Sequence, residues 1–277
     1  MSPDLALVSG SDRLRYASYV GHQLYARRFG HPYHLELAPF PGHGHYWHKL
    51  MALREHLERY EWLVWLDDDA FVTDLRTDVL GDAVRRAQEA GRWLVIAPSC
   101  DDELNGAWAA YNTGVFALRR SEQARALLDL ALDPPLAEIE AWWPAERLGV
   151  FTHGDQDLLA WFVEQGHRDG VELVDPMTWN ARPWHYRSSL QDRPVVHFPG
   201  QPDKTLAIER SARRMGVGPT LVAGSDPGRP LLESPTRQVA SASTLSLATR
   251  TAAAAARRGR TRVVRKVRWV RETGRWS

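Results

Sequence analysis

One stretch most constrains what this chain can fold into: a short apolar run that ends abruptly in three adjacent carboxylates. It reads Glu61-Trp-Leu-Val-Trp-Leu-Asp-Asp-Asp-Ala70. Apolar residues on both faces over five positions predict a strand buried in a parallel sheet. Ligands of such sheets bind at the carboxyl ends of the strands, so we expect the acids to lie at a ligand site.

The three acids differ in the direction of their side chains. In an extended backbone Asp67 and Asp69 point to the same side whereas Asp68 points away, so the outer pair can share one divalent ion. Oxygen ligands of this kind suit Mn²⁺ or Mg²⁺, which commonly complete their shells with substrate phosphates. An acidic loop without a metal would show the same pattern. The metal is favoured because like charges against a buried run are costly unless a cation or solvent relieves them.

Residues Trp62 to Ala70 resemble the W-x-x-W-L-D-x-D-A segment of glycosyltransferase family 34. This family includes galactomannan galactosyltransferases, xyloglucan xylosyltransferases and yeast Golgi mannosyltransferases. The resemblance implies an α/β fold of the GT-A (nucleotide-diphospho-sugar transferase) type, a Rossmann-like mixed sheet flanked by helices. It also implies that Asp67 and Asp69 form the metal-binding DxD pair, that Asp67 and Asp68 contact the donor, and that Mn²⁺ (or Mg²⁺) is the cofactor.

A second block precedes the acidic strand. The segment Trp47-His-Lys49 resembles the W-x-K that opens the helix before this strand in the family, which implies that Lys49 meets the donor. Three histidines, at positions 43, 45 and 48, invite a metal interpretation of the same region. No paired acid or cysteine completes a metal site there, and Gly and Pro predict a loop, so histidines that face solvent or substrate are favoured.

A third block, Trp108 to Arg120, resembles the family's N-T-G-v-f-l-i-R segment. Asn112 and Thr113 offer short hydrogen-bonding groups, and Gly114 allows close approach of the backbone, which suits a wall of the donor site. The alternative is that Asn-Thr-Gly only forms a turn before an edge strand.

A fourth block follows near residue 155. Asp155-Gln156 falls where the family carries D-D-Q, with Gly154 in place of the first acid. The resemblance implies that Asp155 and Gln156 face the donor sugar as catalytic residues. As an alternative, Asp155 is only the N-cap of a helix.

Further candidates lie between residues 142 and 204. His197 matches the histidine of the family's H-F-x-G block, which implies a third metal ligand, and neutral imidazole suits Mn²⁺. Gly200 ends this block, and Lys204 follows it by four residues, where a related family places a phosphate-binding lysine after three. Both are therefore assigned to the donor. Trp142-Trp143 is assigned to packing rather than sugar stacking, and residues 179 to 185 resemble the lining of an acceptor cleft.

Hydrophobic periodicity predicts the remaining elements. Strands are expected over residues 5–10, 93–97, 115–118 and 171–175, and helices over 12–29, 47–60, 76–90, 121–132 and 158–163. The loop after the first strand is the usual position for nucleotide contacts in a doubly wound sheet.

Length and charge divide the chain. At 277 residues it can bury one α/β core, assigned to residues 1–215. Residues 216–249, rich in Gly, Pro, Ser and Thr, are expected to be a flexible linker. Residues 250–277 carry ten basic residues and one acid, a net +9, which leaves 25 basic and 33 acidic residues, a net −8, before them. We expect this tail, helical or disordered, to dock on an anionic membrane surface. Nucleic-acid binding is disfavoured because it would leave the transferase core without a purpose.

The cellular location follows from what the sequence lacks. It has a single cysteine, Cys100, which fits a reducing compartment, and no signal peptide or membrane span is recognisable. Because the eukaryotic relatives are anchored Golgi enzymes, we expect a cytoplasmic, bacterial enzyme, peripheral on the inner membrane face.

These patterns together predict a metal-dependent retaining glycosyltransferase. The donor is expected to be a nucleotide-diphosphate sugar, by default a UDP-sugar, and the acceptor a hydroxyl of a glycan, a lipid-linked molecule or a small molecule. Two alternatives stay open. One is a nucleotide-sugar- or carbohydrate-binding protein without turnover, suggested by Gly154. The other is a nucleotidyltransferase, which also uses paired acids on a similar sheet.

Overall fold

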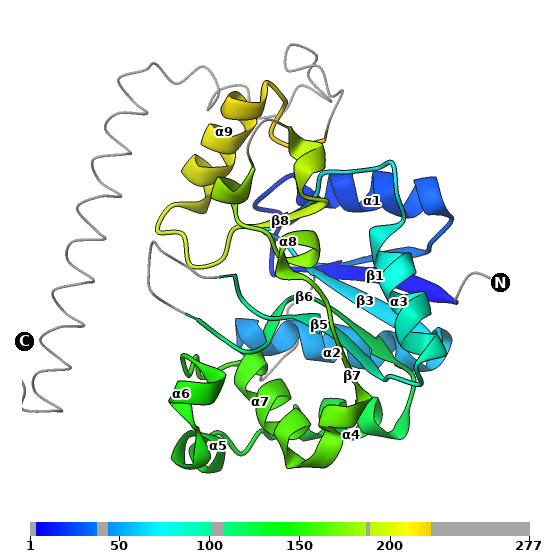
Figure 1. Cartoon of the computed structure of the whole chain (residues 1–277), viewed down its shortest axis with the longest axis vertical. Coiled ribbons are helices and arrows are strands. Elements are labelled where there is room, and N and C mark those ends of the chain that lie inside the picture. Colours follow the sequence, from blue (N-terminus) through cyan, green and yellow to red (C-terminus); the bar gives the residue numbers. More distant parts are fainter. Residues whose placement is uncertain (1–3, 38–43, 101–107, 187–188, 223–277) are drawn as a thin grey trace, which may run out of the picture.

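A six-stranded mixed sheet forms the centre of the molecule, in the order β2-β1-β3-β6-β5-β7 (Figure 1). The computed structural model describes residues 4–37, 44–100, 108–186 and 189–222. The strands are β1 Leu5–Gly10, β2 Tyr33–Glu36, β3 Trp62–Asp67, β5 Leu94–Ala97, β6 Asn112–Arg119 and β7 Val171–Leu173. A separate two-stranded ribbon pairs β4 Ala70–Val72 with β8 Val195–His197.

The direction of β6 decides which residues meet at the functional edge. β1 is parallel to β2 and to β3, but β6 is antiparallel to both of its neighbours, β3 and β5. The expected mixed sheet is confirmed, while the expectation that β3 lies among parallel strands holds on one side only. Because β6 runs the other way, its amino end, Asn112–Gly114, lies beside the carboxyl end of β3. Asn-Thr-Gly is thus the start of a central strand, and the turn before an edge strand is ruled out.

Helices cover both faces of this sheet. They are α1 Ser18–Phe29, α2 His48–His56, α3 Val79–Glu89, α4 Glu122–Leu130, α5 Leu136–Trp142, α6 Ala145–Leu148, α7 Asp155–Phe162, α8 Pro176–Trp179 and α9 Lys204–Met215. None of the helices in the described ranges is long and apolar enough to cross a membrane.

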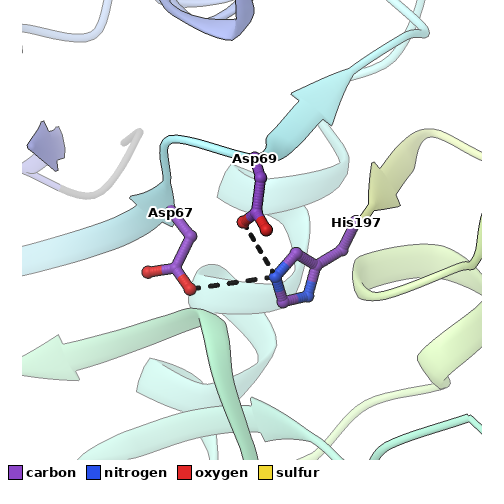
Figure 2. A group of neighbouring side chains, drawn as sticks. All are labelled: Asp67, Asp69 and His197. Atoms are coloured by element: carbon purple, nitrogen blue, oxygen red, sulfur yellow. Dashed lines mark ion pairs between the residues drawn. The ribbon is translucent and has the colours of Figure 1, made fainter. Parts of the chain in front are cut away.

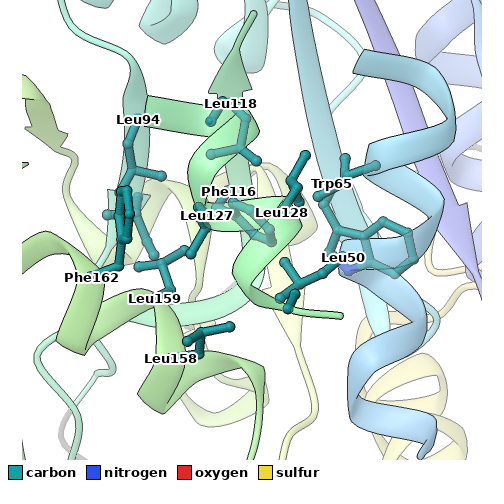
Figure 3. Packing of buried hydrophobic residues seen from close by; sticks show 14 of the residues in the cluster. Leu50, Trp65, Leu94, Phe116, Leu118, Leu127, Leu128, Leu158, Leu159 and Phe162 are labelled. Carbon is teal, nitrogen blue, oxygen red and sulfur yellow. The ribbon is translucent and has the colours of Figure 1, made fainter. Parts of the chain in front are cut away.

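The alternation of side chains along β3 explains its uninterrupted apolar sequence. Leu63 and Trp65 belong to one buried cluster, with residues of α2, α4 and α7 (Figure 3). Trp62, Val64 and Leu66 belong to the opposite cluster, with residues of α1 and α3. Each fully buried side chain of this size stabilises the fold by about 1.5–3 kcal/mol, so β3 is a fixed support for the acids that follow it.

Helix boundaries differ from the sequence expectation at several ends. α1 begins at Ser18 rather than residue 12, because the preceding segment is held by polar contacts: the Ser11 hydroxyl donates to Asp68 at 2.9 Å, and Arg15 Nη1 donates to Ser11. Its end at Gly30, with φ 77°, is as expected. α7 begins at Asp155, three residues earlier than expected.

The packed part of the chain extends past the expected domain boundary at residue 215. Leu221 and Val222 are both buried. Leu221 belongs to a small cluster with Phe71 and Phe198. The rest of the expected linker and the basic tail, residues 223–277, lie outside the described residues.

The buried His22 on α1 predicts an acid-sensitive fold. Its Nε2–H donates to the Ala70 carbonyl at 2.7 Å, and burial lowers the pKa of His22 from 6.5 to about 4. Because the folded pKa is depressed, its contribution to stability is complete above the unfolded pKa of about 6.5 and is lost as pH falls towards 4, at most about 3 kcal/mol.

Urea denaturation at pH 7 and pH 4.5 checks this expectation. The free energy of unfolding should fall less between these pH values in His22→Gln, which keeps a donor but cannot titrate, than in the wild type. The control His153→Gln removes an exposed histidine and should behave as the wild type does. Equal pH dependence of His22→Gln and wild type would contradict the assignment.

Candidate active site

Three side chains that could hold a metal meet where β3, β4 and β8 converge (Figure 2). His197 Nε2 lies 3.1 Å from Asp69 Oδ1 and 3.8 Å from Asp67 Oδ2. The two carboxylates come from the end of β3 and the turn before β4, and the imidazole from the end of β8. Two carboxylate oxygens and one imidazole nitrogen within 4.8 Å of one another are a donor set that suits Mn²⁺. The side chains named from the sequence as metal ligands are thus brought together.

Asn180 fixes the orientation of the His197 ring. Its Nδ1–H donates to Asn180 Oδ1 at 2.7 Å, so the other ring nitrogen, Nε2, faces the acids as a lone-pair donor. Arg182 Nη1 in turn donates to the carbonyl and the Oδ1 of Asn180, at 2.9 and 3.0 Å. This second layer supports the fit of the site to a divalent cation.

These contacts correct the expectation of an acceptor-cleft lining for three of the residues in 179–185. Trp179, Asn180 and Arg182 are buried and support the His197 side of the site, so they do not line an acceptor cleft. Sequence reasoning missed Asn180 because it lies 17 positions before its partner and carries no local pattern.

Gly114 is required by the imidazole of His197. A Cβ atom built at this position would lie 2.0 Å from His197 Cε1. The need for close approach was anticipated, but the group that approaches is a candidate metal ligand of the same chain.

Gly114→Ala is therefore expected to displace the His197 ring and weaken Mn²⁺ binding, at a cost of about 1–3 kcal/mol. Titration calorimetry with Mn²⁺ on the folded variant measures this. Gly44→Ala is the matched control, because its φ is −68° and its Cβ would meet Trp47 at an ordinary 3.7 Å. Unchanged Mn²⁺ affinity in Gly114→Ala would contradict this role.

Lys49 joins two of the acids in the interior. Its Nζ lies 2.9 Å from Asp67 Oδ1 and 3.2 Å from Asp155 Oδ2, and donates to the Thr113 carbonyl at 3.0 Å. Burial opposes the charge of Lys49, but the Asp155 and Asp67 carboxylates outweigh it and raise its pKa. An ammonium group has three donors, and these acceptors occupy all three. Lys49 therefore holds the acids in place.

Asp155 is not the N-cap of α7. Gly154 holds that position, and the Asp157 carboxylate accepts from the backbone N–H groups of Thr152 and Gly154, at 2.7 and 3.2 Å. Burial raises the pKa of Asp155, while Lys49 acts in the opposite direction. The N-cap alternative is therefore wrong, and Asp155 is instead a buried carboxylate paired with Lys49.

The N-T-G and D-Q segments contact each other. Gln156 Oε1 accepts from the Thr113 N–H at 3.4 Å, and Asn112 Oδ1 accepts from the Gly114 N–H at 3.0 Å. The two blocks picked out by resemblance, more than 40 positions apart, are therefore neighbours beside Asp67.

The three acids also line an open cleft of about 280 Å³. It is lined by Gly10, Ser11, Asp12, Arg15, Tyr16, Tyr46, His48, Lys49, Trp65, Asp67, Asp68, Asp69 and Lys204. Of the sequence candidates, Lys49, Lys204 and the three acids line it. The others, Asn112, Thr113, Gly114, Asp155, Gln156, His197 and Gly200, are not part of this lining. Gly200 is exposed in the turn before α9, with φ 62°.

The charges at the floor of the cleft are arranged in opposite pairs. Lys204 Nζ lies 2.5 Å from Asp69 Oδ2. Burial would raise the pKa of Asp69, but His197 and Lys204 outweigh it and lower that pKa. Asp68 points away from this pair, as expected, and burial together with the Asp69 charge raises its pKa to about 6.

The lining residues Ser11, Asp12, Arg15, Tyr16 and Tyr46 were not named as site residues from the sequence. Their signal was the loop after the first strand, which was expected to contact a nucleotide, although no single residue in it stood out. Trp65 was assigned to the strand alone. Its Nε1–H donates to Asp67 Oδ1 at 2.6 Å, so it also orients an acid.

The mixed sheet with paired acids at the end of a central strand agrees with the expected GT-A fold. Residues 2–86 match the model of the galactosyl transferase GMA12/MNN10 family. The matched part includes Lys49 and the three acids and ends before Asn112, Asp155 and His197. Among proteins of curated function, none matches the sequence significantly.

Solved structures agree with the fold. A glycosyltransferase involved in the glycosylation of the major capsid of PBCV-1 superposes with a TM-score of 0.57 at 16% identity, over 76% of this chain and 99% of that chain. Two other structures are much more distant. GlyE of Streptococcus pneumoniae TIGR4 has a TM-score of 0.39 at 12% identity, over 73% of this chain and 56% of that chain. Mouse xyloside xylosyltransferase 1 has a TM-score of 0.34 at 14% identity, over 56% of this chain and 64% of that chain. The protein is a glycosyltransferase of the GT-A type, similar to family 34, as the sequence predicted.

Proposed function

We propose that the protein transfers a sugar from a nucleotide-diphosphate donor, by default a UDP-sugar, to an acceptor hydroxyl with retention of anomeric configuration. The observation that carries the proposal is the group of Asp67, Asp69 and His197, of which the two acids, together with Lys204, line the cleft. A divalent ion, Mn²⁺ or Mg²⁺, would be held by these three residues and would supply positive charge to the diphosphate.

The remaining groups have distinct tasks in this proposal. Lys204, the first residue of α9, offers a second positive charge in the cleft where the diphosphate would lie. Asp155, held by Lys49, and Gln156, which accepts from the Thr113 N–H, would face the donor sugar, as the resemblance implies. Asn112, Thr113, Gly114 and Gly200 act through the backbone and the ligands that they support.

The chemical step is a substitution at the anomeric carbon. The acceptor oxygen forms a bond to this carbon, the bond from the carbon to the diphosphate oxygen breaks, and its electron pair stays on the departing nucleoside diphosphate. The acceptor proton leaves to the departing phosphate or to solvent, so the products are a glycoside and a nucleoside diphosphate.

A nucleotide-release assay tests the proposal. The protein with Mn²⁺ and a panel of nucleotide sugars should release nucleoside diphosphate, EDTA should stop the release, and added Mn²⁺ should restore it. Donor binding without release under any condition would favour the binding protein. Pyrophosphate as a product would identify a nucleotidyltransferase.

We further propose that the basic tail brings this transferase to the anionic cytoplasmic face of a membrane, where a lipid-linked acceptor would lie. Each basic residue near such a surface contributes roughly 1 kcal/mol, and Trp269 and Trp276 offer interfacial anchors. The full chain should sediment with phosphatidylglycerol vesicles at low salt and less at high salt, whereas a truncation after residue 248 should not. Equal binding by both proteins would rule out this role of the tail.

A further inference from the structure

A ladder of neighbouring aromatic rings runs from Trp142, which packs against the core, to His153 at the surface beside the candidate site. Ring centroids are 6.4 Å apart for Trp142 and Trp143, 5.2 Å for Trp143 and Phe151, and 4.6 Å for Phe151 and His153. Trp143 Nε1–H also donates to the Gly149 carbonyl at 2.9 Å. The two tryptophans are thus packing residues, as the sequence favoured, and they support the loop between α6 and α7.

His153, at the outer end of this ladder, is held in an unusual backbone conformation. Its φ is 58°, and Leu221 is the only other non-glycine residue with positive φ among those described. This conformation is uncommon for a residue other than glycine and is often found at functional sites. The imidazole is 62% exposed, and the Glu140 carboxylate, 59% exposed, lies 3.9 Å away. The His153 imidazole, directly before Gly154 and Asp155, and the nearby Glu140 carboxylate are therefore two hydrogen-bonding groups at the surface.

Tyr46 connects this loop to the donor cleft. The residue is 52% exposed and lines the cleft. A Cβ atom at Gly154 would lie 3.4 Å from Tyr46 Cγ, so the ring lies against the backbone at the start of α7. Tyr46 therefore lies next to the residue that precedes Asp155.

Trp108 lies at the other end of the same segment. Its carbonyl accepts from the Val150 N–H at 2.8 Å, and a Cβ at Gly149 would lie 2.7 Å from the indole Cε3. The indole therefore packs directly on the Gly149 backbone, and the residue is 37% exposed. From residue 149 to 153 the chain spans at most about 14 Å, the reach of a short run of linked sugar rings.

We propose that Trp108, His153 and Tyr46 form a saccharide-binding surface that holds the acceptor. This inference rests on the proposed function and specifies the acceptor as a glycan. Flat aromatic rings pack on the apolar faces of pyranoses, while exposed imidazole and carboxylate groups bind their hydroxyls. A lipid or protein partner would be matched by a more uniformly apolar face. The surface is continuous with the donor cleft through Tyr46, so a bound glycan would present a hydroxyl at the donor sugar.

Saturation-transfer NMR with the full chain tests the surface, using the methyl glycosides of glucose, galactose, mannose and xylose as probes. At least one glycoside should receive saturation from the wild type. Trp108→Ala and His153→Ala should each bind it about fivefold more weakly. Leu173→Ala is the control, because Leu173 is 56% exposed on β7 and belongs to neither site. Affinity for UDP with Mn²⁺ is the internal reference, since neither Trp108 nor His153 lines the cleft.

The outcomes separate this inference from the proposed function. Absence of saturation transfer to any glycoside, or equal binding by the variants and the wild type, would overturn the saccharide surface even if nucleotide release is observed. Loss of sedimentation with vesicles in Trp108→Ala would assign the surface to lipid and overturn it as well. Glycoside binding that depends on Trp108 and His153 in a protein that releases no nucleotide would support the surface and reject the transferase.

Discussion

Asp69→Asn will lower Mn²⁺-dependent nucleotide release by about 10²–10³-fold. Asp69 is buried, and its two oxygens face His197 Nε2 at 3.1 Å and Lys204 Nζ at 2.5 Å. The amide keeps the shape of the side chain but removes its negative charge. A cation would then face one carboxylate instead of two, while Lys204 would lose its partner.

Initial rates over a series of Mn²⁺ concentrations measure this effect, and more Mn²⁺ should be needed for half-maximal rate. Asp82→Asn is the matched control, since Asp82 forms an exposed pair with Arg85 on α3 at 3.0 Å and should keep the wild-type rate. A wild-type rate and Mn²⁺ dependence in Asp69→Asn would exclude Asp69 as a ligand and leave the metal site without support.

The sequence was informative wherever the signal was local. The strand over Trp62–Asp67 and the directions of the three acids follow from the alternation of side chains along an extended chain, which neighbouring residues alone determine. The resemblance then added His197, which no local pattern would have connected with Asp69. The structure brings their atoms together because β8 pairs with β4, directly after the acids.

The sequence was uninformative where a role depends on contacts between distant segments. Nothing in the order of residues says that β6 is antiparallel to β3, so the contact between Gly114 and the His197 ring could not be predicted. Likewise Lys49 was assigned to the donor because of its motif, and its two carboxylate partners emerged only when α2, β3 and α7 were placed together.

Lys49→Met should therefore destabilise the fold, by about 3–5 kcal/mol at pH 7. Methionine has a similar length but leaves the partly buried Asp67 and the buried Asp155 without their shared cation. Burial already raises the pKa of Asp155 with Lys49 present, and loss of the ammonium group raises it further. A carboxyl whose folded pKa is raised is least harmful when protonated, so the deficit of the variant should shrink as pH is lowered and grow as pH rises through that pKa.

Urea denaturation of Lys49→Met at pH 7 and pH 5 measures both effects. Asp155→Asn in the same chain should restore part of the lost stability, because it removes one of the two unpaired charges, and the double-mutant cycle gives the coupling. Lys204→Met is the control: its partner Asp69 is buried too, but the Lys204 side chain is 32% exposed, so solvent screens the pair and the loss should be smaller. If Lys49→Met instead kept wild-type stability and only weakened donor binding, Lys49 would be a donor ligand after all, and the alignment of Asp155 would need another cause.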